Sequence, residues 1–292
     1  MGCFESSLLD RWIDNPAINE IKLTIDGNEL TIPAQSGIEY KFDYGKHTLT
    51  YNNDSLNFIV KPAKFGTTSF INPTQSNYFI NTVVYSTSNV SQEEYDKISQ
   101  KELKNLSVMV DGEQAEIELP TVEINDVFIN KMDTNWDYSF DEPFPEELSQ
   151  ELNLPKGSYY YDDKRKLFRE VDFIDYLKND GVEEAISFSY QPKKFNEITK
   201  HVFPNIDLTA IKCEADQTYM KELLNDWHHL FMLKGGDFAS TYNKLTSNDA
   251  SHKNSESKKL YNLVTDPDGT YHKALTEITD AIRDVYFFVI KS

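Results

Sequence analysis

Imidazole and carboxylate side chains at helical spacing are the first candidates for catalysis in this sequence. Glu222, Asp226 and His229 recur at intervals of four and three residues, so they share one face of a predicted helix, with His228 beside them. Such a group can bind a metal ion or exchange protons. The His-x-x-x-His spacing of a zinc-binding helix is missing, however, and solvated polar residues opposite Trp227 are the favoured interpretation.

Other motifs that would indicate a reaction are missing from the sequence as well. There is no P-loop, no Gly-x-Gly-x-x-Gly and no Gly-x-Ser-x-Gly. The remaining histidines are isolated in the sequence, namely His47, His201, His252 and His272. We therefore predict a non-catalytic protein without a cofactor or a metal, and keep a hydrolase-like enzyme with a spatially assembled site as an alternative.

The strongest signal is the distribution of charge. The 292 residues carry a formal net charge of −19, and residues 111–151 alone hold 13 acidic residues and one basic residue, Lys131. Acidity that serves only solubility is expected to be dispersed. Concentrated acidity predicts a contact surface for a basic partner, and it argues against binding to nucleic acid or to anionic lipid.

The segment from Met132 to Asp141 alternates between aromatic or apolar and polar residues, which predicts a strand. Its aromatic residues would then share one face and its acids the other. The acidic face either protects a sheet edge or captures Lys and Arg from a partner. The predicted partner-binding residues are Asp133, Trp136, Asp137, Tyr138, Asp141, Glu142, Glu146 and Glu147.

The same segment places oxygen-bearing side chains where a calcium loop needs them. The sixth position, which requires Gly, is Tyr138, and the twelfth, which requires Glu, is Phe144. Both anchors of such a loop fail, so no calcium site is predicted.

Residues 19–61 predict a β-meander that places these features on a β-rich framework. Asp26-Gly27 is typical of a two-residue hairpin, and alternating apolar residues predict strands on both sides of it. Leu23-Thr24-Ile25-Asp26-Gly27, Ile32-Pro33 and Tyr44-Gly45-Lys46-His47-Thr48-Leu49 together resemble a PEGA-type β-sandwich module. The resemblance covers about forty residues, 20–61, and implies a non-catalytic accessory or interaction module.

The first residues predict either lipid attachment or a short helix. Gly2 and Cys3 stand where N-myristoylation and a second acylation would occur. Helical spacing of the apolar residues favours a short terminal helix, on Phe4, Leu8, Leu9, Trp12 and Ile13. A peripheral membrane protein, acylated at Gly2 or Cys3, is the alternative function.

The cysteines and the hydropathy pattern bear on location. Cys3 and Cys213 give no disulfide framework, which favours a reducing compartment. No stretch reaches the length of a membrane span and no secretory signal is recognised. A soluble cytoplasmic protein is predicted.

The second half of the chain becomes helical in pattern. Ser91 and Glu94 form a predicted capping box, and Asp111-Gly112 predicts a second hairpin. Apolar residues from Tyr271 to Val289 follow a heptad-like rhythm, which predicts one long final helix and allows a homodimer through it. The predicted domains are residues 1–90 (terminal helix and β-module), 91–191 (mixed, with the acidic segment) and 192–292 (helical bundle).

Together these patterns predict an α+β fold with an N-terminal antiparallel β-meander or sandwich, a mixed middle region and a C-terminal helical bundle. The predicted function is an acidic binding protein that engages a basic protein partner. An inhibitor or immunity-type protein is one concrete form, and mimicry of nucleic acid by the carboxylates is a variant.

Overall fold

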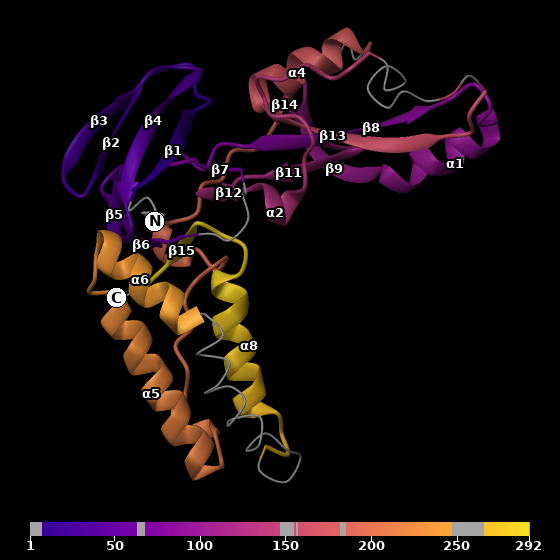
Figure 1. Cartoon of the computed structure of the whole chain (residues 1–292). Helices are drawn as coiled ribbons and strands as arrows, with labels where there is room; N and C mark the ends of the chain where they lie inside the picture. Colours follow the sequence, from indigo (N-terminus) through magenta and orange to yellow (C-terminus); the bar gives the residue numbers. More distant parts are fainter. Residues whose placement is uncertain are drawn as a thin grey trace.

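The computed structural model describes residues 8–62, 68–146, 155, 157–181, 185–246 and 266–291. Antiparallel sheets dominate the first part of the chain and the longer helices follow toward the C-terminus (Figure 1). The predicted α+β class is confirmed.

The largest sheet contains most of the predicted meander. Its strands, in spatial order, are β15 (Phe287–Val289), β6 (Asp54–Val60), β5 (Gly45–Tyr51), β2 (Ile21–Ile25) and β3 (Asn28–Ile32). Asp26 and Gly27 have φ angles of 51° and 80°, as the tight β2–β3 hairpin requires. Asn52 and Asn53 make the β5–β6 turn in the same way, with φ angles of 48° and 62°. The predicted hairpins are confirmed.

A second sheet contains a strand where the sequence predicted a helix. Its order is β12 (Phe128–Asn130), β7 (Ser69–Ile71), β1 (Leu8–Asn15) and β4 (Ser36–Asp43). The helix prediction is wrong because Leu9 and Ile13, four residues apart, share a face in a strand as well as in a helix. The pairing of β1 with β4 selects the strand over the helix. Gly37 permits it, since a Cβ there would lie 2.5 Å from the Ile13 carbonyl oxygen and from the Trp12 ring.

The middle of the chain forms two three-stranded sheets. One is β11 (Thr121–Ile124), β8 (Tyr78–Ser86) and β13 (Tyr161–Arg169), and the other is β10 (Glu113–Leu119), β9 (Lys104–Val110) and β14 (Ile186–Ser187). Helices α1 (Gln92–Glu102) and α4 (Glu170–Asn179) accompany them. The predicted capping box of α1 is confirmed, because Ser91 and Glu94 exchange hydrogen bonds of 3.2 and 3.3 Å.

The C-terminal helices extend away from the sheets in Figure 1. They are α5 (Glu214–Leu230), α6 (Gly235–Thr246) and α8 (Thr270–Ile282), preceded by the short 3₁₀ turns η1 (Phe195–Glu197) and η2 (Leu208–Ala210). The prediction of one helix as far as Val289 is wrong. The chain turns after Ile282, and β15 joins the sheet beside β6. Tyr271 and Ile278, which belong to the predicted dimer seam, are buried within this chain.

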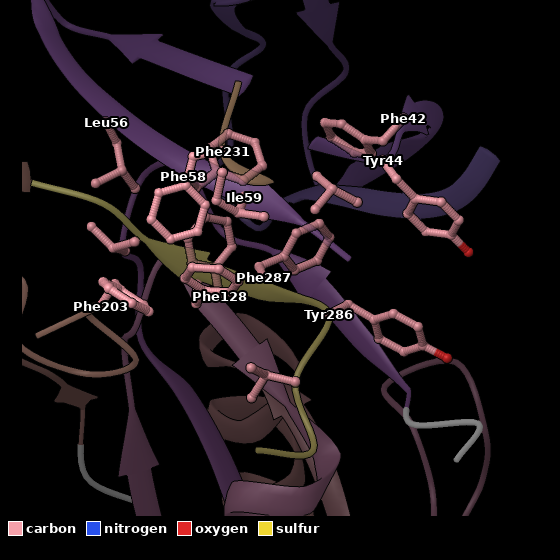
Figure 2. Close-up of a cluster of buried hydrophobic side chains, with 14 of the residues drawn as sticks. Phe42, Tyr44, Leu56, Phe58, Ile59, Phe128, Phe203, Phe231, Tyr286 and Phe287 are labelled. Atoms are coloured by element: carbon pink, nitrogen blue, oxygen red, sulfur yellow. The ribbon is translucent and has the colours of Figure 1, made fainter. Parts of the chain in front are cut away.

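One hydrophobic core joins the start and the end of the chain. Figure 2 shows Phe58 of β6, Phe128 of β12 and Phe287 of β15 packed together. The ring centroids of Phe128 and Phe287 are 5.0 Å apart, and those of Phe58 and Phe128 are 5.1 Å apart. The same core contains residues of α5, α6 and α8. Segments 1–90 and 192–292, predicted as separate domains, therefore share one core, whereas β8 pairs with strands of the middle region.

A lysine lies inside this molecule at the end of β6. Lys61 is 2% exposed, and its ammonium lies 5.3 Å from the centre of the Tyr242 ring. Its Nζ donates a long hydrogen bond of 3.4 Å to the Pro62 carbonyl oxygen. Burial lowers the pKa of Lys61 from 10.5 to about 8, although the charge of Asp284 acts in the opposite direction. Burial also raises the pKa of Tyr242.

We predict that Lys61→Met stabilises the protein at neutral pH. Between pH 8 and 10.5 the unfolded chain keeps the Lys61 proton and the folded chain releases it, so wild-type stability rises with pH across this window. The shift corresponds to on the order of 3 kcal/mol at pH 7. Urea unfolding of Lys61→Met should therefore show a higher free energy of unfolding at pH 7 and a smaller rise across the window. The exposed Lys46→Met is the control and should change stability by less than about 0.5 kcal/mol. A Lys61→Met protein with the wild-type slope would contradict the assignment.

Candidate functional site

The predicted acidic strand is not a strand. Residues 131–134 form a short helix, α2 (Lys131–Thr134), which Asn130 caps by accepting from the Met132 backbone N–H. Asn135 then adopts a left-handed conformation with φ of 47°, which breaks the alternation. The following residues run beside β13 and form a single bridge, Tyr138 with Lys166. The strand prediction is wrong because a local cap and turn override the alternating pattern.

The aromatic residues of the segment do not share one face either. Trp136 is 1% exposed and belongs to a small core together with Tyr78, and Phe140 packs at the edge of that core. Tyr138 instead meets Phe144, with ring centroids 6.0 Å apart. Trp136 is therefore an internal anchor, and a partner cannot use it as a contact residue without unfolding the segment.

Asp133 binds bases of its own chain. Its Oδ2 lies 2.9 Å from His201 Nε2 and 3.5 Å from Lys200 Nζ, and its side chain is 21% exposed. Burial acts to raise the pKa of Asp133, but the hydrogen bond and charge of His201 and the charge of Lys200 outweigh it and lower the pKa. Lys200 also binds Asp126 at 2.8 Å. This cluster joins the acidic segment to the loop before α5.

The remaining acids of the segment lie along the basic strand β13. Asp137 Oδ2 accepts the Arg165 backbone N–H at 2.9 Å, and the Glu142 carbonyl oxygen accepts from Lys166 Nζ. Asp141 Oδ1 is 3.9 Å from Arg169, although the Asp141 side chain is 74% exposed. These contacts tie the segment to β13, and they bring the Asp141 carboxylate within ion-pair distance of a cation. Glu146 is exposed, and Glu147 lies outside the described residues.

Arg169 is the most deeply placed cation of this group. Its Nε and Nη2 donate to the two carboxylate oxygens of Asp14 at 2.9 and 2.7 Å. Tyr78 Oη and Trp12 Nε1 donate to the same carboxylate at 2.5 and 2.8 Å. Burial acts to lower the pKa of Arg169, but Asp14 outweighs it and raises the pKa. Burial, followed by the charge of Asp14, raises the pKa of Tyr78. The hydrogen bonds of Asp14 with Arg169 and Tyr78 therefore join β1 to β13 and β8.

A different group of acids from residues 111–151 remains exposed to solvent. They lie on the β9–β10 hairpin, whose turn residues Asp111 and Gly112 have φ angles of 50° and 85°. We call this group the hairpin acids, which are Asp111, Glu113, Glu116 and Glu118. In the part of the chain that the structure describes, none of the four forms an ion pair. Their charge is therefore available to a partner, unlike that of Asp133.

An open recess of about 340 Å³ lies at the edge of β1, where β7 begins. Its lining residues are Asp10, Arg11, Trp12, Glu39, Thr68, Ser69 and Tyr286. The Arg11 guanidinium stacks 3.7 Å above the centre of the Tyr286 ring, and burial lowers the pKa of Arg11. Arg11 Nε and Ser69 Oγ are buried without hydrogen-bond partners. The residues that line the recess can form hydrogen bonds with a ligand. Among them, no nucleophilic side chain is hydrogen-bonded to a general base.

The histidine cluster predicted on α5 gives no metal centre. Glu222, His228 and His229 are exposed on α5, as is Asp226, which makes a contact of its own. Among the described residues, no three His, Cys, Asp or Glu side chains come together as metal ligands. No helix within the same residues is long and apolar enough to cross a membrane. The predicted acylation sites Gly2 and Cys3 lie outside them.

Sequence reasoning missed two side-chain pairs, one of which involves His47, a histidine that is isolated in the sequence. His47 Nδ1 lies 2.7 Å from Asp26 Oδ2, and the second Asp26 oxygen accepts the Thr48 backbone N–H at 2.8 Å. This pair ties the β2–β3 hairpin to β5. A histidine that follows a hairpin Asp on a later strand of the same predicted meander is a sequence signal for such a pair. No local signal joins Arg169 to Asp14, because 155 residues separate them.

Comparisons of the chain with protein-family models, with curated proteins and with solved structures found no match. The resemblance of residues 20–61 to a PEGA-type module therefore stays a prediction.

We predict that Asp14→Asn destabilises the protein by about 3–5 kcal/mol, because it leaves Arg169 as a buried charge without its counter-ion. Asp141→Asn is the matched control, since it removes an exposed carboxylate that faces the same guanidinium. The control should cost less than about 1 kcal/mol. Equilibrium urea unfolding followed by tryptophan fluorescence measures both. Equal losses for the two variants would contradict the central role of the Asp14 pair.

Proposed function

We propose that this protein is a non-catalytic binding protein that engages a basic protein partner. An inhibitor or immunity-type protein, directed against a cationic toxin or nuclease, is the concrete form of the proposal. The carboxylates would then occupy positions that phosphates take in the partner's own ligand, which is how mimicry of nucleic acid would operate. The proposal includes a cytoplasmic location and no cofactor.

The observation that supports this proposal is the division of the acidic residues into two groups. Asp133 lies against His201 and Lys200 of the same chain, Asp141 lies within ion-pair distance of Arg169, and Asp137 accepts a backbone N–H. The hairpin acids have no such partners among the described residues and project from an exposed strand. Unpaired charges of one sign attract an oppositely charged protein and accelerate its association. We therefore assign the partner surface to the hairpin acids and not to residues 133–147.

The proposed surface predicts a specific loss of binding. A variant in which Glu113, Glu116 and Glu118 are all replaced by Gln should bind the basic partner about tenfold more weakly at low salt, with a flatter salt dependence. The partner is first captured from native lysate at low salt, released at high salt and identified by mass spectrometry. Surface plasmon resonance with the purified partner then gives association rates at several salt concentrations.

The matched control removes the same number of exposed carboxylates elsewhere. Replacing Glu20, Glu39 and Glu222 by Gln reduces the net negative charge by the same amount, and all three lie outside the β9–β10 hairpin. This control should keep at least half of the wild-type affinity, about 0.4 kcal/mol of change or less. If both triple variants lose affinity to the same degree, only the overall charge matters and the hairpin is not the contact surface. Failure to capture any basic protein at low salt would contradict the proposed function itself.

A further inference from the structure

Strand β10 lies at the edge of its sheet. The order of the sheet is β10, β9 and β14, so β10 pairs on one side only among the described residues. A two-residue turn makes Val110 and Glu113 a hydrogen-bonded pair. The pairs then alternate, so the backbone N–H and C=O groups of Gln114, Glu116 and Glu118 point away from β9. The hydrogen bond from the Asp111 N–H to the Ala185 carbonyl oxygen supports this alternation, because it points to the side of β9 that faces away from β10.

The side chains of β10 alternate in the same phase. Gln114, Glu116 and Glu118 are exposed on the outer face of the sheet, opposite the likewise exposed Ser107 and Asn105 of β9. On the inner face, apolar residues are half-buried against the core of the middle region, namely Ala115, Ile117 and Leu119. The open edge therefore offers backbone hydrogen-bonding groups, one acidic face and one apolar face.

We propose that this edge takes an extended segment of the basic partner as an additional strand, in which Lys or Arg alternates with apolar residues. The proposal rests on the proposed function and specifies its binding mode. Residues opposite each other in adjacent strands place their side chains on the same face, about 5 Å apart. Basic side chains of the added strand would face Glu116 and Glu118, and its apolar side chains would extend the layer of Ile117 and Leu119. Backbone pairing supplies affinity and the alternating contacts supply selectivity.

Charge complementarity selects this occupant over a second copy of the chain. Two β10 edges paired with each other would bring Glu116 and Glu118 against glutamates of the second copy, and like charges opposite each other destabilise a ladder. Charged residues on an edge strand normally prevent such self-association. The same charges favour a cationic strand.

The test uses synthetic peptides and the full-length protein. One peptide alternates lysine and valine, and a second has the same composition with its lysines and valines in separate blocks. Isothermal titration calorimetry at low salt should show the alternating peptide binding at least about tenfold more tightly. N-methylation of the peptide amides that face β10 should abolish this advantage, whereas N-methylation of the alternate amides should leave it unchanged.

Two variants separate backbone pairing from charge. Gln114→Pro removes one outward N–H and keeps every hairpin acid, and edge strands tolerate Pro at such a position. Gln114→Ala keeps the N–H and controls for loss of the side chain, which donates to Ser107 Oγ at 3.2 Å. Gln114→Pro should weaken the alternating peptide at least about fivefold and Gln114→Ala less than about twofold. In hydrogen exchange, the amides of Glu116 and Glu118 should become protected when the peptide is bound.

The outcomes distinguish this inference from the proposal on which it rests. One set of results would overturn strand addition but leave charge attraction standing. In that set, both peptides bind equally, the two Gln114 variants behave alike, and the triple Glu→Gln variant binds neither peptide. Strand addition is also overturned if the edge amides exchange at the same rate in the bound and unbound protein. If the triple variant binds both peptides as wild type does, the hairpin acids are not the partner surface and both proposals fail.

Discussion

The carboxylate of Asp14 holds together two parts of the molecule that have separate sheets. It receives four donors, two from Arg169 and one each from Tyr78 and Trp12, and it lies at 0% exposure. A buried charge is tolerated only when its hydrogen-bonding capacity is filled, and here each oxygen has two partners. Breaking the arrangement on either side leaves a charge without compensation. The positions of β1 against β8 and β13 are therefore tightly specified, and the chain beside β13 is arranged around Arg169.

The acidic segment acquires its structural role from that arrangement. β13 carries several cations on one short strand, and each finds an anion or a carbonyl oxygen nearby. Phe140 lies 4.1 Å from the Arg169 guanidinium, so the segment contributes an aromatic face as well as carboxylates. From residues 111–151, Asp141 comes within ion-pair distance of β13, at Arg169, and Asp126 and Asp133 pair with Lys200. Among the described residues, the four hairpin acids form no ion pair.

Features set by neighbouring residues could be predicted from the sequence, and features set by distant residues could not. Asp26-Gly27 and Asp111-Gly112 determine their turns by their own φ preferences, and Ser91 with Glu94 determines the start of α1. The spacing of Leu9 and Ile13 suits a helix and a strand equally, so only the pairing with β4 decides. Likewise, the apolar rhythm continues past the end of α8 because Val285 and Val289 are buried there as well, in the turn before β15 and in β15 itself. The pairing of Asp133 depends on Lys200 and His201, and 68 residues separate Asp133 from His201.

The position of β15 has a consequence for how the protein is made. Phe287 lies opposite Val60, so the edge of β6 stays without its neighbour until the ribosome has synthesised all of the residues between them and β15 itself. During translation the nascent chain therefore presents an open, apolar strand edge for many seconds, since elongation adds only about 5–20 residues each second. Such an edge is a site for association with other nascent chains. Folding of this protein in the cell is accordingly expected to depend on chaperones that shield β6 during synthesis.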